Sequence, residues 1–320
     1  MPGKRGRTKS AHSRDSAQKS AHRASPAPSS PHPAISLRWL AAAGAVAIVA
    51  AVACAWGTLC FLFWQGSWQL LYHPVAPVVR TPANAALRFD SIGFATAADG
   101  VSQLHGWWIP ADPESRYTAI YLHGADGNLS DSVDAFTPLH RAGLTVFAFD
   151  YRGYGQSQFA RPSQMRLRED AGSAIGYLTN TRHISAGSIV LVGRDLGANL
   201  ALEVAAAHPE LAGVVLENPL ESPTAAIFSD PRAHLVPAHA LVSDRWDLNA
   251  AAANLRISSL WFYWTPAKNA DRQEDAPNAY QKVTARKSLV WLTDSPGSAK
   301  DYDSALSRWL DDLPATVNSR

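Results

Sequence analysis

Cysteine is nearly absent from this chain of 320 residues. The two cysteines, Cys54 and Cys60, both fall inside one apolar segment. The remainder of the sequence therefore has no thiol, which excludes a disulfide framework, a cysteine–zinc site and a thiol nucleophile in the main domain. The spacing of histidines and carboxylates also matches no metal-ligand motif, so we expect no metal and no cofactor.

Charge is absent from residues 39–64, a run of 26 positions. At about 1.5 Å per residue, this segment is long enough to cross a hydrocarbon core of about 30 Å. Trp39, Trp56, Trp64 and Trp68 lie near its ends, where tryptophan anchors a helix at the membrane interface. The segment is longer than the apolar region of a cleaved signal peptide. We therefore expect an uncleaved signal-anchor, a single transmembrane helix in contact with the lipid bilayer.

Basic residues are missing just after this segment, and none occurs before Arg80. Residues 1–38 carry eight Lys and Arg against one acid, and the positive-inside rule then predicts a cytoplasmic N-terminus. The main domain would be extracytoplasmic, which means periplasmic if the cell is bacterial. The basic tail is rich in Ser, Pro and Ala and is expected to be disordered. The rest of the chain has 21 basic and 26 acidic residues, so nucleic acid is not an expected partner.

Apolar runs alternate with helical patterns over most of the remaining chain, and no internal repeat is present. Runs that are apolar on both faces predict strands covered on both sides, and hence a doubly wound, mostly parallel sheet of about eight strands in the α/β class. The predicted strands cover 88–94, 102–109, 118–123, 144–150, 188–193, 211–217, 258–264 and 287–293. The predicted helices cover 129–141, 166–180, 197–208 and 302–312.

The predicted sheet sets the domain borders. The α/β domain is expected over 87–313, after a proline-containing linker at 65–86 and before a short tail at 314–320. Between the sixth and seventh strands, an excursion of about 219–255 is long enough to form a small cap over the strand ends.

One strand–turn–helix motif, VLVGRDLGANLALEVAAA at 190–207, indicates an active-site turn. An apolar strand stops at Gly193, turns through Asp195 and restarts at Gly197 as a helix. This is the pattern G-x-Nu-x-G of a nucleophile elbow. The two glycines leave room for a tight turn that exposes the middle residue at the end of the strand.

A second motif, LHGADGN at 122–128, follows the third predicted strand. In a fold with a nucleophile elbow, this loop supplies one oxyanion donor and the residue after the nucleophile supplies the other. The expected donors are the backbone N–H groups of Ala125 and Leu196. His123 is expected to hold the loop rather than act as a base.

The motifs YLHGADGN, FDYRGYGQS, LVGRDLGANLALE, VVLENPLES and SDRWDL occur in this order along the chain. In this combination the sequence resembles the α/β-hydrolase superfamily, in particular the serine aminopeptidase-like group of α/β-hydrolase-domain esterases. The resemblance covers roughly residues 85–313. It implies an α/β-hydrolase fold with a small cap, and a site derived from serine hydrolases, many of which are membrane-anchored.

The sequence departs from this family at all three catalytic positions. The nucleophile serine is replaced by Asp195. The acid position falls on Ala267, with Asp271 four residues further on. The turn that should carry the histidine contains Ala299 and Lys300, and no histidine occurs after His239.

Asp195 has two interpretations. The simpler one is an N-cap of the following helix, with its carboxylate held in its charged form by the oxyanion donors. The other is a nucleophile that attacks an alkyl carbon, as in haloalkane dehalogenases and epoxide hydrolases of this fold. That route needs a base: Lys300 lies in the right turn, and His208, His234 and His239 lie in the elbow helix or the cap.

The sequence therefore predicts an α/β-hydrolase-like pseudoenzyme with a degenerate site, non-catalytic or strongly impaired, that has a binding or scaffold role for an unidentified small molecule or protein. The alternative is a hydrolase, either with Asp195 as the nucleophile or with residual esterase activity. Other polar and aromatic positions are expected to be structural. Arg194 should face solvent or pair with an acid, Asp247 should tie the cap to the domain, and Trp107, Trp108, Trp261 and Trp264 should pack on strands.

Overall fold

The computed structural model describes residues 36–95, 101–112, 115–265, 276–293, 295 and 297–314. The chain divides into two compact units, Met1–Ala53 and Cys54–Arg320. The long helix α1, Leu37–Gly66, contributes to both. Among the described residues it is the one helix long and apolar enough to cross a membrane.

The end of α1 belongs to the globular unit. Phe63 is only 6% exposed and joins the hydrophobic core, against which Leu59 and Cys60 also pack. The predicted linker at 65–86 also packs against the domain. The Tyr72 hydroxyl donates to the Asp244 carboxylate at 2.5 Å in a buried contact. The last two turns of the apolar segment are therefore held by protein.

The main sheet has eight strands in the order β10-β9-β8-β7-β4-β6-β3-β2. The pairs β2–β3 and β3–β6 are antiparallel, and every other pair is parallel. This confirms the predicted mostly parallel α/β fold. The strands are β2 Asp90–Ala95, β3 Ser102–Ile109, β4 Thr118–Leu122, β6 Thr145–Asp150, β7 Ile189–Arg194, β8 Gly213–Glu217, β9 Ser258–Thr265 and β10 Lys287–Thr293.

A second, two-stranded sheet joins the chain after α1 to the loop after β4. Its strands are β1, His73–Pro74, and β5, Asp126–Gly127, which run parallel. The His73 N–H also donates to the Ala125 carbonyl at 3.0 Å. The segment that follows α1 is therefore fixed at the edge of the sheet where the strands end.

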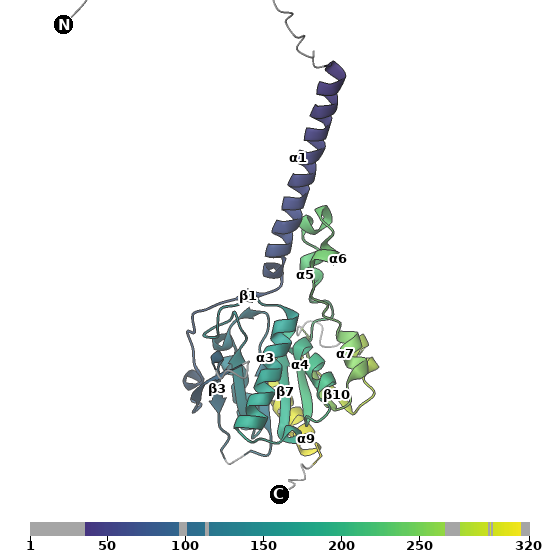
Figure 1. Ribbon diagram of the computed structural model, residues 1–320. Coiled ribbons are helices and arrows are strands. Elements are labelled where there is room, and N and C mark those ends of the chain that lie inside the picture. Colours follow the sequence, from purple (N-terminus) through teal and green to yellow (C-terminus); the bar gives the residue numbers. More distant parts are fainter. Residues whose placement is uncertain are drawn as a thin grey trace, which may run out of the picture. The chain divides into compact units, whose positions relative to one another are not determined.

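Helices cover both faces of the main sheet because each presents an apolar stripe to it (Figure 1). One face of the sheet is covered by α3, α4, α7 and α8, which bury side chains in one hydrophobic cluster. The other face is covered by α2 and α9, which bury side chains in a second cluster. Their bounds are α2 Val133–Arg141, α3 Gln164–Gly176, α4 Leu196–Ala207, α7 Leu248–Asn254, α8 Asn278–Lys282 and α9 Ser298–Asp311. Single-turn helices η1 to η6 cover Ser67–Leu70, Pro82–Ala85, Leu129–Ser132, Tyr177–Thr181, Ala186–Ser188 and Pro231–Leu235.

Most of the expected cap consists of single-turn helices. Between β8 and α7 lie α5, Ala225–Phe228, then η6, and then α6, Ala238–Leu241. Asp247 is the N-cap residue that precedes α7, and its carboxylate accepts a hydrogen bond from the Ala250 N–H at 2.9 Å. Asp247 thus has a local structural role as a helix cap.

Candidate active site

The turn between β7 and α4 has the strained geometry of a nucleophile elbow. Asp195 has φ 51° and ψ −120°, a backbone conformation that residues with a side chain rarely adopt. A Cβ on Gly193 would lie 2.2 Å from the Gly197 carbonyl oxygen, and one on Gly197 would lie 2.1 Å from the Leu122 oxygen. The Asp195 N–H donates to the Glu217 carbonyl at 2.8 Å, which fixes the turn against β8.

The Asp195 side chain is exposed and accepts no hydrogen bond from the described residues. The interpretation as a side-chain N-cap is therefore wrong, although Asp195 does occupy the position before the first residue of α4. The physical reason is the backbone: a capping side chain needs an extended N-cap residue, and the elbow holds Asp195 at positive φ. The elbow geometry directs the carboxylate away from the helix N–H groups.

The expected stabilisation of the charged carboxylate is also not observed. The pKa of Asp195 is raised above its ordinary value, because protein atoms on the enclosed side of the turn remove part of its hydration. The neighbouring Arg194 guanidinium lowers this pKa, but desolvation, to which the charge of Asp126 adds, outweighs it. The Asp195 carboxylate accepts no hydrogen bond from the N–H of Ala125 or Leu196, so it does not occupy the expected oxyanion hole.

None of the eight histidines that the structure describes bonds to Asp195. His123 is buried, and its Nδ1 lies 2.8 Å from the Gly124 carbonyl oxygen. The His208 Nδ1 contacts Glu210 at 2.7 Å, and His239 in the cap stacks on Phe228. The remaining described histidines are His73, His105, His140, His183 and His234.

At the positions expected for the catalytic acid and histidine, the described residues include no side chain that could take either role. Ala267 and Asp271 lie outside them. Ala299 and Lys300 lie in the first turn of α9, and both are exposed. This helix begins at Ser298, four residues earlier than predicted, so part of the expected histidine turn is helical.

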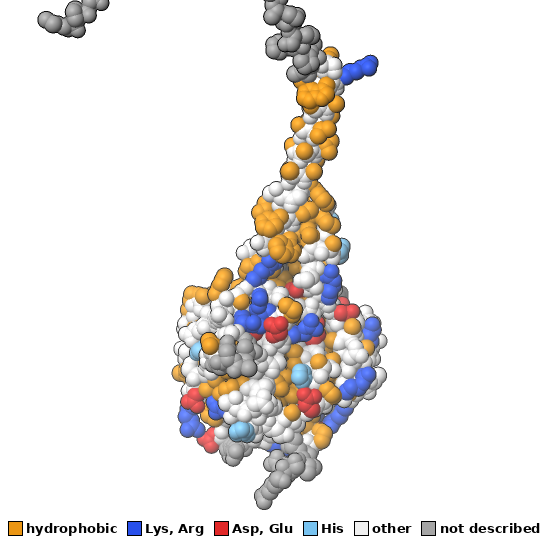
Figure 2. Space-filling model, viewed as in Figure 1, with side chains coloured by type: hydrophobic (Ala, Val, Ile, Leu, Met, Phe, Trp, Pro, Cys, Tyr) orange, Lys and Arg blue, Asp and Glu red, His pale blue; other side chains and the backbone are white. Residues whose placement is uncertain are grey.

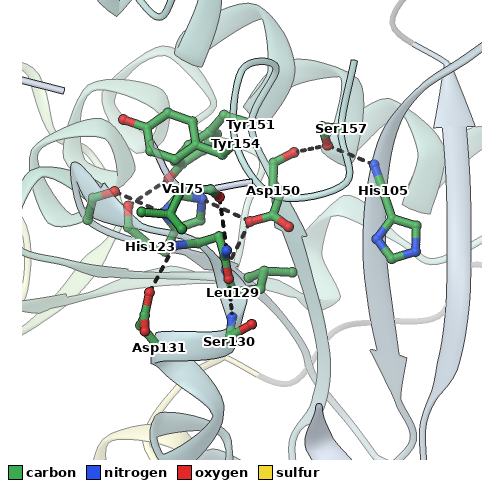
Figure 3. A network of polar contacts seen from close by, with 12 residues as sticks. Val75, His105, His123, Leu129, Ser130, Asp131, Asp150, Tyr151, Tyr154 and Ser157 are labelled. Atoms are coloured by element: carbon green, nitrogen blue, oxygen red, sulfur yellow. Dashed lines mark hydrogen bonds and ion pairs between the residues drawn. The ribbon is translucent and has the colours of Figure 1, made fainter. Parts of the chain in front are cut away.

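A buried polar network supports the loop that carries Ala125 (Figure 3). Asp150, the last residue of β6, accepts a hydrogen bond from the Leu129 N–H at 2.9 Å. The Tyr151 hydroxyl donates to the His123 carbonyl at 3.0 Å, and the Tyr154 hydroxyl donates to the Ala125 carbonyl at 2.9 Å. These contacts fix the backbone of the oxyanion loop, and His123 has the structural place expected of it.

Asn128 completes this loop from inside the protein. It is buried, its side-chain oxygen accepts from the Ser130 N–H at 2.8 Å, and its amide donates to the carbonyls of Val75 and Pro77, both at 2.9 Å. The triplet Asn128-Leu129-Ser130 matches the N-glycosylation pattern. Because the amide is fully engaged, the folded domain has no room for a glycan there.

Residues 120–282 match the family model described as alpha/beta hydrolase fold. The chain belongs to this family. It is 40% identical to the uncharacterized protein YfhR of Salmonella typhimurium over 136 residues, which are 41% of this chain and 44% of YfhR. The alpha/beta hydrolase domain-containing protein WAV2 of Arabidopsis thaliana is 31% identical over 162 residues, 48% of this chain and 52% of WAV2. The matches thus span about half of each relative.

Solved structures of α/β hydrolases resemble the fold. The esterase Pf2001 of Pyrococcus furiosus superposes with a TM-score of 0.57 at 18% identity, over 76% of this chain and 98% of the esterase. The α/β hydrolase GrgF of a Penicillium species gives a TM-score of 0.53 at 17% identity, over 70% of this chain and 97% of GrgF. At these identities the likeness concerns the fold alone.

A cleft of about 550 Å³ opens beside the elbow of this α/β-hydrolase domain. Its floor is formed where four parallel strands end, and it lies between α2 and α9. Arg194 lies 3.4 Å from the buried Glu217 carboxylate, which accepts a second contact from the Tyr302 hydroxyl at 2.6 Å. The Arg194 guanidinium also lies 5.5 Å from the centre of the Trp264 ring.

Sequence reasoning predicted only part of this cleft. Arg194 pairs with an acid, one of the two alternatives expected for it. Trp107 and Trp261 are buried among strands, whereas Trp264 lines the cleft. Glu217 and Tyr302 were not predicted as site residues, although an acid that ends a fully buried strand is a signal that could have identified Glu217. Burial raises the pKa of the Glu217 carboxyl, and Arg194 opposes that shift.

Proposed function

We propose that this protein is a membrane-anchored member of the α/β-hydrolase family that binds a ligand and does not hydrolyse esters. One observation carries the proposal: Asp195 occupies an intact elbow, and none of the described imidazoles forms a hydrogen bond with it. A nucleophile of this fold needs a general base within hydrogen-bond reach to complete a turnover.

The chemistry of a carboxylate nucleophile supports the same conclusion. Attack of Asp195 on an ester carbonyl would give a mixed anhydride, and water would then need activation to release the enzyme. The raised pKa of Asp195 further lowers the fraction of the reactive carboxylate at acidic pH. Ester hydrolysis is therefore the least favourable activity for this site.

A binding role is supported by the cleft and by the organisation of the chain. The cleft beside the elbow offers about 550 Å³, the size of a small-molecule site. Its Arg194–Glu217 pair and the Trp264 ring provide polar and aromatic contacts for a ligand. The apolar length of α1 and the basic residues before it support a bilayer anchor with a cytoplasmic N-terminus and an extracytoplasmic domain.

A second candidate is a hydrolase in which Asp195 attacks an alkyl carbon. The observation that favours it is the free carboxylate: it is exposed and accepts no hydrogen bond from the described residues. Incubation with haloalkanes or epoxides followed by peptide mass analysis tests it. Release of the alcohol or diol over multiple turnovers, with a transient ester on Asp195, would support this second candidate, whereas a permanent adduct without product would show alkylation and no hydrolysis.

Labelling with a fluorophosphonate probe tests the first proposal. We expect no labelling of the wild-type protein, and no esterase activity in Asp195→Ser, because a serine at the elbow still lacks a base. Labelling and steady hydrolysis by Asp195→Ser would show that a base exists and would refute the proposal. Thermal unfolding of both proteins checks that the substitution leaves the fold intact.

A further inference from the structure

We infer that the tip of the cap, residues 225–241, docks on the bilayer surface, and that the outer boundary of the hydrocarbon lies at Trp56. This inference rests on the proposed membrane anchor and adds a second membrane contact to it. The direct observation is a hydrogen bond from the Trp56 Nε1–H to the Leu235 carbonyl at 3.1 Å. It places the cap tip beside the apolar helix, 179 residues away in sequence.

The backbone of the cap tip fixes the depth of the boundary. Irregular backbone with exposed polar groups does not occur in contact with lipid tails. The single turn η6 is of this kind, and Asp230 and Arg232 form an exposed ion pair at its start. Since η6 ends at Leu235, beside Trp56, the hydrocarbon must end at or before this level.

The length of α1 agrees with this boundary. From Leu37 to Ala55 the helix has 19 residues, about 28 Å at the α-helical rise, close to the ~30 Å of a hydrocarbon core. Trp39 and Trp56 are separated by about 26 Å, which suits the two interfaces where tryptophan is enriched. The boundary therefore lies eight residues before Trp64, where the apolar run ends.

The part of α1 that follows Trp56 contacts protein and charged groups that are incompatible with lipid tails. Phe63 is buried in the domain core, as expected for a turn that has left the bilayer. The Arg161 guanidinium donates to the Trp64 carbonyl at 2.7 Å, about 12 Å along the helix from Trp56. A charged group at that height stays outside the hydrocarbon.

The cap tip itself presents apolar side chains at the proposed boundary. Leu235 is 60% exposed and Trp56 is 53% exposed, and the tip also exposes Ala225, Ala226 and Ala240 together with His234 and His239. Figure 2 shows apolar side chains gathered over the cap and the adjoining turns of α1, with Lys and Arg side chains on the face of the domain below them. Exposed apolar side chains next to polar and charged ones are the composition of a surface that rests at a membrane interface and not within the hydrocarbon.

Fluorescence quenching by spin-labelled lipids tests this inference in the full chain reconstituted into phospholipid vesicles. In a background with Cys54→Ala and Cys60→Ala, the single variants Leu235→Cys, Val46→Cys and Ser185→Cys are each labelled with an environment-sensitive fluorophore. All three positions are exposed, and Ser185 lies at the opposite end of the strands from the elbow. We expect the label at position 235 to lose most of its fluorescence with a nitroxide near the lipid headgroup, and less with one deep in the acyl chains.

The two reference positions separate the failure of the inference from the failure of the anchor. The label at position 46 should be quenched best by the deep nitroxide, and the label at position 185 by neither. If position 46 is quenched while position 235 behaves like position 185, the anchor stands and the cap does not dock. Deep quenching at position 235 would equally refute the boundary, and an unquenched position 46 would refute the anchor together with the inference.

Discussion

The Nε2 atom of His123 lies 3.7 Å from the Oδ1 atom of Asp150, and both side chains are about 1% exposed. Neither the His123 Nε2 nor the Asp150 Oδ2 atom has a hydrogen-bond partner among the described residues. Burial raises the pKa of Asp150 to about 7 and lowers the pKa of His123 to about 4. Between these values both groups are therefore neutral, which avoids a buried charge beneath the oxyanion loop.

Asp150 and His123 should change the free energy of unfolding in opposite directions as the pH rises. Between pH 3.8 and about 7, folded Asp150 keeps a proton that the unfolded chain releases, so its contribution falls as the pH rises. Between about pH 4 and 6.5, His123 is protonated in the unfolded chain but neutral in the folded protein. Its contribution to the free energy of unfolding therefore rises with pH. In the wild type these slopes largely cancel.

Single substitutions should reveal each slope. Relative to the wild type, the free energy of unfolding of His123→Gln should decrease from pH 4 to pH 6.5 and that of Asp150→Asn should increase from pH 4 to pH 7, each by up to about 1.4 kcal/mol per pH unit. Urea unfolding at a series of pH values measures both. Parallel curves for the wild type and the two variants would contradict the burial of two neutral groups.

Arg194→Met should destabilise the domain because it leaves the buried Glu217 carboxylate without its cation. Removing one partner of a fully buried pair costs about 3–5 kcal/mol, and the partial exposure of Arg194 reduces the expected loss to about 2–3 kcal/mol. Arg194→Met combined with Glu217→Gln should recover most of the loss. The matched control is Arg232→Met, which removes the exposed cation of an ion pair in the cap and should change the unfolding midpoint much less.

Gly193→Ala and Gly197→Ala should each disrupt the elbow, because the new Cβ would lie about 2 Å from a backbone oxygen that cannot move freely. We expect a loss of about 3 kcal/mol or more, beyond ordinary overpacking. Gly172→Ala is the control: it lies in α3 with nothing within 4 Å of the new Cβ, and should stabilise the helix by about 0.5–1 kcal/mol. Equal effects at all three glycines would show that the elbow tolerates a wider turn.

The sheet could be predicted from the sequence because a strand buried on both faces is a continuous apolar run. The runs at 102–109 and 287–293 coincide with β3 and β10, and the other main strands begin and end within two residues of prediction. The two-residue strands β1 and β5 could not be predicted, since their pairing joins distant segments and leaves no periodic pattern. The same holds for Phe63, whose burial depends on a core formed by later residues.

The candidate site was predictable in its backbone and less so in its side chains. The glycine spacing located the elbow, but helix-capping preferences gave the wrong role for Asp195 because they ignore its positive φ. Glu217 and Tyr302 meet from β8 and α9, 85 residues apart, so no local motif connects them. The contact of Glu217 with both Tyr302 and Arg194 depends on the folded sheet and helix.

The central claim is that an elbow with Asp195 and without a bonded imidazole does not complete hydrolysis. Steady-state hydrolysis of short p-nitrophenyl esters by the purified full chain, compared with Asp195→Asn, tests it most directly. We predict that wild type and Asp195→Asn release p-nitrophenol at the same background rate. Multiple turnovers by the wild type that disappear in a folded Asp195→Asn protein would contradict the claim.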